Sequence, residues 1–307
     1  MEVTHPRMTH PDLVPDAPLA RFTTIRVGGN ADWLAEAGSG RAVVSALAWA
    51  RDAGVPVAVV GKGSNLLIDD AGFRGLVIRL RGRLEGISVR GDRVWCGGGA
   101  SLPRAVQRAA KAGLTGLEFG ASIPGTAGGA VAMNAGAYSS ELKDVLEWAV
   151  LCSADGRRRV ALDELLFGYR SSAVRSFEVV VTVCFRLRPG DPDAIKATLG
   201  EFRTHRRTTQ PQGARTFGSV FTNPAGGSSG RLLEAAGCKE LAIGGARFSP
   251  VHANFIEAAP QCSSADVLAL MSEGRRRVLA MGGPLLESEV RYLHPEYGIG
   301  APPLEAP

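Results

Sequence analysis

At 307 residues, with 45% hydrophobic and 21% charged residues, the chain has the composition of a folded protein of two or three domains, which excludes an intrinsically disordered chain. Its formal charge of +5 is only mildly basic, and its short, scattered basic runs without interleaved aromatic residues argue against a nucleic-acid-binding protein. The five cysteines are odd in number and form no Cys-x-x-Cys pair, which argues against a disulfide framework and against a zinc site, and no metal is expected.

Targeting signals are also missing from the sequence. The first residues lack the basic-then-apolar pattern of a signal peptide, and no apolar run reaches the length of a membrane span. Together with the unpatterned cysteines, this predicts a cytoplasmic protein with no membrane partner. Only five of the 35 basic residues are lysine. The excess of arginine fits anionic ligands, but a preference for arginine codons is the favoured explanation of the ratio.

The first third of the chain alternates helical and strand patterns. Residues 1–16, with three Pro and two His, indicate a flexible leader. A helix is predicted over 41–54, because apolar residues recur at helical spacing and Gly54 can end it. The apolar run 55–61 predicts a buried strand that opens into the loop 61–65. The next predicted elements are strands over 75–80, 84–89 and 93–98, and a helix over 102–112.

The rest of the chain changes pattern twice. Seven glycines within 113–137 favour loops there, and the segment 189–192 (PGDP) indicates a linker. A capped helix start is predicted at Ser263, because Asp266 follows it three residues later. The elements predicted around these features are strands over 147–153, 157–162, 178–187, 241–249 and 285–293, and helices over 194–206, 229–236 and 263–280.

Several glycine-containing loops follow predicted strands. They lie at 27–30, 61–65, 97–99 and 123–129. Glycine lets backbone N–H groups approach an anion such as a pyrophosphate closely. Each loop alone could be an ordinary turn, and none shows the G-x-G-x-x-G fingerprint between a strand and a helix. The cluster of loops nevertheless favours a dinucleotide ligand over a simple metabolite.

A series of motifs carries a resemblance to one family over nearly the whole chain. In order along the chain, the motifs are TTIRVGGNADWL (23–34), VGKGSNLLIDDAGFRGLVIRL (60–80), GLEFGASIPGTAGGAVAMNAGAY (116–138), FGYRSS (167–172), GSVFTNP (218–224) and LESEVR (286–291). Together they resemble the UDP-N-acetylenolpyruvoylglucosamine reductase (MurB) family, in its shorter subtype without a long substrate-loop insertion. The first three alone resemble the wider FAD-binding fold of vanillyl-alcohol oxidase and p-cresol methylhydroxylase.

The resemblance implies an α+β fold, in which two subdomains of the vanillyl-alcohol oxidase type hold FAD and a smaller C-terminal α/β domain binds substrate. The expected division is a leader at 1–16, FAD-binding subdomains at 17–80 and 81–190, and a substrate domain at 191–307. An alternative division assigns the last strand and the C-terminal tail to the first FAD-binding subdomain. The small-molecule UDP-sugar is the expected partner, and the chain is expected to act as a monomer.

The cofactors that the resemblance implies are FAD and NADPH. Some relatives in the wider family attach the flavin to a histidine, but this chain has no histidine between positions 11 and 204, so we expect non-covalent FAD. The expected cofactor-binding residues are Gly28, Gly29, Val60, Gly61, Lys62, Gly63, Ser64, Asn65, Ser122, Ile123, Pro124, Gly125, Gly128, Gly129, Asn134, Gly136 and Ala137.

The expected reaction adds a hydride from flavin N5 to the methylene carbon of the enolpyruvyl ether and a proton to the neighbouring carbon. Such chemistry needs a cation at the carboxylate, a positioned acid and exclusion of water. By resemblance, Arg170 is the cation and Ser219 the proton donor. Outside these motifs, Arg170 would be taken for a surface arginine and Ser219 for a turn serine.

A second electrophilic or acid group is expected at Glu289. In an apolar site its pKa would rise, so that the protonated form could hydrogen-bond the substrate carboxylate. Along a strand Glu287 would face the same side, so spacing alone does not separate the two, and the resemblance selects Glu289. The expected substrate-binding residues are Tyr169, Asn223 and Arg207, with Arg203 and Arg206 on the same predicted helix as further diphosphate candidates.

Three departures from the family pattern and three other functions remain open. Relatives usually have Lys at the position of Thr222, Gly at Ser139 and Val-Asn at 257–258. The alternatives are a related flavin reductase of another nucleotide-sugar, a flavin oxidase and a non-catalytic flavin-binding module. Retention of all three expected catalytic residues argues against the last of these.

Overall fold

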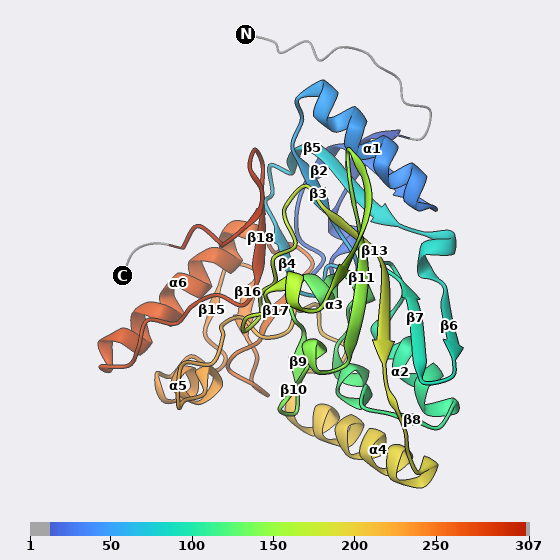
Figure 1. Ribbon diagram of the computed structural model, residues 1–307. Coiled ribbons are helices and arrows are strands. Elements are labelled where there is room, and N and C mark those ends of the chain that lie inside the picture. The colour runs from blue at the N-terminus through green and yellow to red at the C-terminus, as the bar shows by residue number, and fades with distance from the viewer. Residues whose placement is uncertain (1–12, 305–307) are drawn as a thin grey trace. The chain divides into compact units, whose positions relative to one another are not determined.

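The computed structural model describes residues 13–304, which form two compact units, each built from separate stretches of the chain (Figure 1). The larger unit comprises residues 13–15, 33–61 and 75–206, and the smaller unit comprises 16–32, 62–74 and 207–304. Residues 1–12 of the expected leader lie outside the described residues, and 13–16 are part of strand β1. The mixture of helices and sheets is the predicted α+β class; the expected boundaries at 80 and 190 stay predictions.

The larger unit is organised around two sheets. One has the strand order β1-β2-β5-β3, and the other, β12-β11-β13-β7-β6, is antiparallel throughout. Two short strand pairs, β10-β9 and β14-β8, complete it. The strands are β1 (Leu13–Pro18), β2 (Asn30–Ala37), β3 (Val57–Val59), β5 (Phe73–Leu80), β6 (Ile87–Arg90), β7 (Arg93–Gly97), β8 (Leu114–Thr115), β9 (Gly136–Ala137), β10 (Ser140–Glu141), β11 (Leu146–Ser153), β12 (Gly156–Ala161), β13 (Val179–Arg186) and β14 (Arg188–Pro189).

Apolar residues on both faces of β13 explain why helices cover this sheet on two sides. Val179 and Val181 belong to the core that α1 (Gly40–Ala53) shares, whereas Val180 belongs to the core of α2 (Leu102–Lys111) and α3 (Ala127–Ala132). Successive strand residues point to opposite faces, so an apolar run here fills two cores. The helix predicted over 41–54 is confirmed: Ser39 accepts the N–H of Ala42, and Gly54 ends the helix at φ +66°.

Helix α3 lies inside the segment 113–137, which was expected to be rich in loops, and it is an element that this expectation did not include. Its glycines serve packing. The N–H of Gly128 donates to the carbonyl of Gly98 at 2.8 Å. A Cβ at Gly128 would lie 2.9 Å from that oxygen and 3.0 Å from the carbonyl oxygen of Val180. Only glycine therefore lets α3 approach the sheet this closely.

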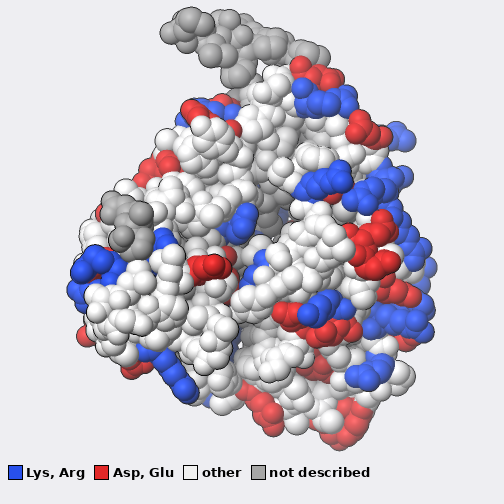
Figure 2. All heavy atoms as spheres, turned by 60° about the vertical axis from the view of Figure 1, so that its left-hand side comes forward, with Lys and Arg blue, Asp and Glu red and all other residues white. Residues whose placement is uncertain are grey.

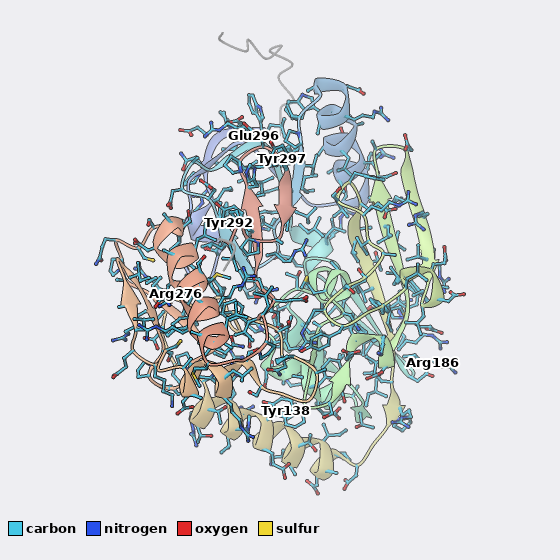
Figure 3. All side chains as sticks on the ribbon, turned by 90° about the vertical axis from the view of Figure 1, so that its left-hand side faces the viewer. Tyr138, Arg186, Arg276, Tyr292, Glu296 and Tyr297 are labelled. Atoms are coloured by element: carbon cyan, nitrogen blue, oxygen red, sulfur yellow. The ribbon has the colours of Figure 1, made fainter. Side chains whose placement is uncertain are left out.

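Helix α4 (Pro192–Thr209) begins directly at the predicted linker, so that 189–192 is not a free connection. Tyr138 lies against this helix (Figure 3). Its ring stacks on that of Phe202 with centroids 3.7 Å apart, and its hydroxyl donates to the carbonyl of Phe202 at 3.1 Å. The contact fixes the end of the loop that follows α3.

The smaller unit combines two three-stranded sheets, β15-β16-β17 and β19-β18-β4, with two helices. Its core joins apolar side chains from distant segments, such as Ile25, Leu67, Phe221 and Leu270. The capping box predicted at Ser263 and Asp266 is confirmed. The elements are β4 (Leu66–Ile68), β15 (Ala242–Ile243), β16 (Ala246–Phe248), β17 (Ile256–Ala258), β18 (Arg291–His294), β19 (Gly298–Gly300), α5 (Ser229–Ala235) and α6 (Ser264–Ala280).

Three strand predictions need correction. The strand expected over 241–249 is the hairpin β15-β16, because Gly244 turns the chain at φ +53°. The strand expected over 285–293 begins only at Arg291. The strand expected over 84–89 begins at Ile87, after a 3₁₀ turn.

The surface and the helices bear on the partners of the protein. Basic and acidic side chains are interspersed over the face in Figure 2 and form no continuous basic stripe there. Within residues 13–304, no helix has both the length and the apolar character needed to cross a membrane.

Candidate functional site

The loop at 62–65 of the smaller unit offers backbone donors. Gly63 adopts φ +57°, and a Cβ there would lie 2.4 Å from the carbonyl oxygen of Phe22, so only glycine fits. Among the described residues, the N–H groups of Gly63, Ser64 and Asn65 have no hydrogen-bond acceptor. Successive unsatisfied N–H groups suit an anion such as the pyrophosphate of a dinucleotide.

In the larger unit, the loop before α3 contacts Gly61, which follows strand β3. A Cβ at Gly61 would lie 2.7 Å from Oγ1 of Thr126, and that hydroxyl caps α3 by accepting the N–H of Gly129 at 3.2 Å. Two of the expected cofactor loops are thus held together by small residues. The donor set fits a dinucleotide such as FAD, and Gly63, Ser64 and Asn65 are the residues best placed to hold its pyrophosphate.

Asn134, expected at the cofactor, is fully engaged inside the larger unit. Its Nδ2 donates to Glu141 at 3.1 Å and to the carbonyl of Gly168 at 3.0 Å, and its Oδ1 accepts the N–H of Lys143 at 3.2 Å. The side chain is fully buried. Asn134 therefore ties the loop around Gly136 to the turn that carries Arg170. A direct cofactor contact through its side chain would break bonds that build this loop.

Arg170 stands at the tip of a tight turn in which Gly168 and Ser171 exchange backbone hydrogen bonds. Its φ of +54° is uncommon for a residue with a Cβ. Nη2 donates to the carbonyl of Gly136 at 3.1 Å, and Nη1 lies 4.0 Å from Oε1 of Glu141. The guanidinium lies 4.7 Å from the ring centre of Tyr169, which is itself half exposed. These contacts hold a planar cationic fork in one orientation.

The carboxylate beside Arg170 is ionised. The hydrogen bond from Lys143, at 2.7 Å, is the main cause that holds the pKa of Glu141 below its ordinary value, and Arg170 adds to the effect. Lys143 and Arg170 therefore both stabilise the ionised form of Glu141.

The backbone segments that carry Ser219 and Glu289 are hydrogen-bonded to each other in the smaller unit. The N–H of Glu289 donates to the carbonyl of Val220, the residue after Ser219, at 2.9 Å. Nδ2 of Asn65 donates to the carbonyl of Glu289 at 3.0 Å, which connects this segment to the loop described above. The segments of the expected proton donor and the expected second acid are thus paired, and Asn65 of the donor loop is bonded to the second of them.

The structure also separates the two glutamates that the motif LESEVR offers. The strand on which Glu287 and Glu289 were expected to face the same side begins only at Arg291, so the strand spacing does not apply to them. Glu287 is exposed, whereas Glu289 is half-buried. The two glutamates therefore differ in burial.

The substrate-binding candidates fare differently. Oδ1 of Asn223 accepts the N–H of Ser229 at 3.1 Å, so this side chain caps α5. Nη1 of Arg206 donates to the carbonyl of Ser122 at 2.8 Å, next to the expected cofactor loop. Arg203 and Arg207 are exposed. A role of Asn223 or Arg207 in binding substrate stays a prediction.

Asn254 is a functional residue that the sequence reasoning missed. It is 3% exposed, and its side chain replaces a strand partner: Oδ1 accepts the N–H of Phe221 at 2.9 Å, and Nδ2 donates to the carbonyl of Phe221 at 2.8 Å. Burial lowers the pKa of His252, whose neutral Nδ1 accepts the N–H of Asn254 at 3.2 Å. Asn254 thereby positions the segment of Ser219.

Replacing Asn254 should show this role. Asn254→Ala would leave the N–H and the carbonyl of Phe221 buried without partners, and each such group costs about 1–3 kcal/mol. We expect the free energy of unfolding to fall by about 2–5 kcal/mol in chemical denaturation. The matched control is Asn30→Ala, whose amide donates to Asp16 on the surface of the same unit. Equal stability of both variants would contradict the role of Asn254.

Comparisons with known proteins agree with this arrangement. Residues 31–161 match an FAD binding domain, and residues 210–293 match the C-terminal domain of UDP-N-acetylenolpyruvoylglucosamine reductase. The chain is 46% identical to UDP-N-acetylenolpyruvoylglucosamine reductase from Anaeromyxobacter dehalogenans (strain 2CP-C), over 91% of this chain and 84% of that protein. It is 44% identical to the enzyme of that name from Synechococcus sp. (strain WH7803), over 90% and 91%.

A solved structure gives the same result. The crystal structure of UDP-N-acetylenolpyruvylglucosamine reductase (MurB) from Thermus caldophilus matches with a TM-score of 0.80 and 36% identity, covering 91% of this chain and 97% of that one. Sequence and fold therefore agree over nearly the whole length of both proteins. The chain belongs to the UDP-N-acetylenolpyruvoylglucosamine reductase family.

Proposed function

We propose that this protein uses FAD and NADPH to reduce UDP-N-acetylglucosamine enolpyruvate to UDP-N-acetylmuramate, a step of peptidoglycan precursor synthesis. Family membership supports the activity and both cofactors. The observation that carries the proposal is the backbone pairing of the segments of Ser219 and Glu289, the second of which Asn65 binds through its carbonyl. The bound flavin supplies a hydride to the methylene carbon of the enol ether.

Arg170 is proposed to bind the substrate carboxylate. Addition of hydride to the methylene carbon shifts an electron pair toward the carboxylate, and a guanidinium fork stabilises that charge. The bond to the carbonyl of Gly136 uses one of its donors and leaves the fork oriented. Arg170 therefore stabilises the charge without itself exchanging a proton, since its pKa is far above neutral.

Ser219 is proposed to deliver the proton that completes the reduction. The carbon next to the ether oxygen carries the developing electron pair, and a hydroxyl in contact with it can protonate so basic a centre. Glu289 is proposed to hydrogen-bond the carboxylate as the protonated acid, for which its partial burial is suited. The overall change adds one hydride and one proton across the double bond.

An anaerobic stopped-flow experiment tests the proposed function. The flavin absorbance should be bleached by NADPH and then return when UDP-N-acetylglucosamine enolpyruvate is added, with UDP-N-acetylmuramate as product. Reduction by NADPH without any reoxidation by the UDP-sugar would refute the proposal.

The flavin should be held without a covalent bond. No histidine lies between positions 11 and 204, where a histidine attachment would be needed. Precipitation of the yellow protein with acid should therefore release all flavin into the supernatant, measured by its absorbance. Flavin that stays with the pellet after washing would show a covalent attachment and contradict this prediction.

The proposed setting is the cytoplasm, with the chain acting as a monomer. The odd number of cysteines without a pairing pattern supports a reducing compartment. Light scattering of the purified protein checks the oligomeric state.

A further inference from the structure

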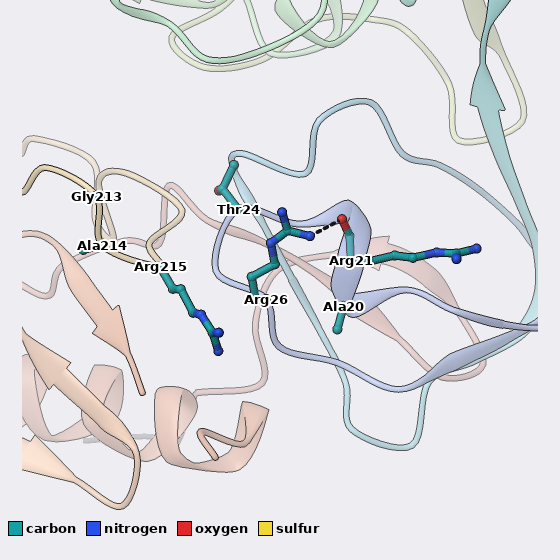
Figure 4. Close-up of a pocket in the computed structure, with 7 residues that line it drawn as sticks. All are labelled: Ala20, Arg21, Thr24, Arg26, Gly213, Ala214 and Arg215. Atoms are coloured by element: carbon teal, nitrogen blue, oxygen red, sulfur yellow. Dashed lines mark hydrogen bonds between the residues drawn. The ribbon is translucent and has the colours of Figure 1, made fainter. Parts of the chain in front are cut away.

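The smaller unit contains an open cavity of about 590 Å³ for which the proposed roles above have no use (Figure 4). Two segments far apart in the sequence line it. Its lining residues are Ala20, Arg21, Thr24, Arg26, Gly213, Ala214 and Arg215. A volume of this size is within the range of small-molecule sites, and three of the seven lining residues carry a positive charge.

Arg26 is held in place at the wall of this cavity. Its φ is +64°, a conformation that costs free energy for a residue with a Cβ and is often found at ligand sites. Its N–H donates to Oγ1 of the buried Thr23 at 3.1 Å, and its Nη1 donates to the carbonyl of Arg21 at 2.6 Å. The surrounding loop thus fixes both the backbone and the guanidinium of Arg26 before any ligand arrives.

Arg215 lines the cavity from the other segment. Figure 4 shows its side chain extending toward the loop that carries Arg26, while the Arg26 guanidinium is turned toward the carbonyl of Arg21. Arg21 lies 4.6 Å from the ring centre of Phe22. Within residues 13–304, neither Arg26 nor Arg215 forms an ion pair with a carboxylate. Two cations that line one cavity without a counterion attract an anion.

We propose that this cavity binds a phosphate group through Arg26 and Arg215. Guanidinium forks match the oxygens of a phosphate, and two forks can share one tetrahedral anion. The N–H of Thr24, in the cavity wall, donates to the carbonyl of Gly63 at 3.2 Å, so the cavity adjoins the donor loop. The inference rests on the proposed function, whose three ligands, FAD, NADPH and the UDP-sugar, all carry phosphate.

Isothermal titration of the FAD-loaded protein with inorganic phosphate and with pyrophosphate tests the site. Arg215→Gln removes a side chain that forms no hydrogen bond within residues 13–304, and Arg26→Gln removes the second cation of the cavity. Loss of one charge-assisted contact should weaken binding roughly tenfold to hundredfold. The control is Arg231→Gln, which removes an exposed charge of the same unit outside the cavity. Equal weakening in the control, or no difference between either variant and the parent, would overturn the site.

Further measurements show which ligand, NADPH, the UDP-sugar or FAD, supplies the phosphate group that binds in the cavity. If the 2′-phosphate of NADPH occupies the site, both variants raise KM for NADPH in flavin reduction and leave KM for NADH unchanged. If the UDP-sugar occupies it, they weaken binding of UDP in the same titration. If FAD occupies it, the loaded parent binds no phosphate and the variants are purified with less flavin. A parent that binds no phosphate, with variants of normal flavin content, would overturn the proposal.

These outcomes are distinguishable from failure of the proposed function. Phosphate binding and flavin content need no turnover. Failure of the function would instead appear as reduced flavin that the UDP-sugar does not reoxidise, whatever the variants do to phosphate binding.

Discussion

Arg170→Lys is expected to slow hydride transfer to the UDP-sugar by about 10–100-fold, the loss of one charge-assisted hydrogen bond. Lysine keeps the positive charge but lacks the planar fork that binds both carboxylate oxygens. Reduction of the flavin by NADPH should stay near the parent rate, because that step develops no charge on the substrate carboxylate. The measurement is the rate of each half-reaction, followed separately by flavin absorbance.

The matched control for this prediction is Arg175→Lys. Arg175 is an exposed arginine of the same unit, five positions further along the chain, and its guanidinium lies 5.7 Å from the ring centre of Phe177. Both half-reactions should be unchanged in the control. If Arg170→Lys also leaves both unchanged, Arg170 has no catalytic role. If it slows both equally, the turn that carries Arg170 has been disturbed.

Local signals in the sequence predicted the helices that carry their own caps. The helix at 41–54 has a serine before it and a glycine after it, and the helix at 263–280 has its capping box within four residues. Helix α3 also has a cap, Thr126, but it was not predicted because Gly128 and Gly129 lower helix propensity. Helix α3 is favoured by the close packing of Gly128 against Gly98 and Val180. Because these residues are distant in the sequence, no local pattern indicates the helix.

The site could be predicted only in part for the same reason. The motif resemblance pointed to Ser219 and Glu289, but the pairing of their segments depends on the hydrogen bond from Glu289 to Val220, which joins segments about 70 positions apart. The resemblance also selected Glu289 over Glu287, and the structure adds that the two differ in burial. Asn254 could not be predicted, because a single buried asparagine acts here as a strand partner and leaves no pattern of spacing. Strand β18 begins at Arg291 and not at the predicted residue 285. Its start follows its pairing with the distant strand β4, which the local sequence does not indicate.

Ser219→Ala is expected to slow reoxidation of the reduced flavin by the UDP-sugar by ~10²–10⁴-fold, the usual contribution of a positioned general acid. The two half-reactions differ in their need for a proton donor. Hydride passes from NADPH to the flavin without a protein acid, whereas the UDP-sugar step needs a proton delivered to carbon. Reduction by NADPH and the flavin content should therefore match the parent.

The fold should survive this change. The hydrogen bonds that place Ser219 run through the backbone of Val220, which donates to the carbonyl of Asn254 at 2.9 Å and accepts the N–H of Glu289 at 2.9 Å. Removing one hydroxyl disturbs neither bond. Ser228→Ala is the matched control, since Ser228 belongs to the same unit and its side chain makes no capping bond to α5. Both half-reactions of that control should equal the parent's.

Ser219→Cys should recover part of the lost rate, because a thiol can also donate a proton although its larger sulfur shifts the geometry. If Ser219→Ala instead reoxidises with the UDP-sugar as fast as the parent, the proton comes from another group. Glu289 is then the next candidate, because it is half-buried and its N–H donates to the carbonyl of Val220, the residue after Ser219. Glu289→Gln would test it, since glutamine keeps the shape of the acid but has no acidic proton to give, so slow reoxidation in that variant would move the role of donor from Ser219 to Glu289.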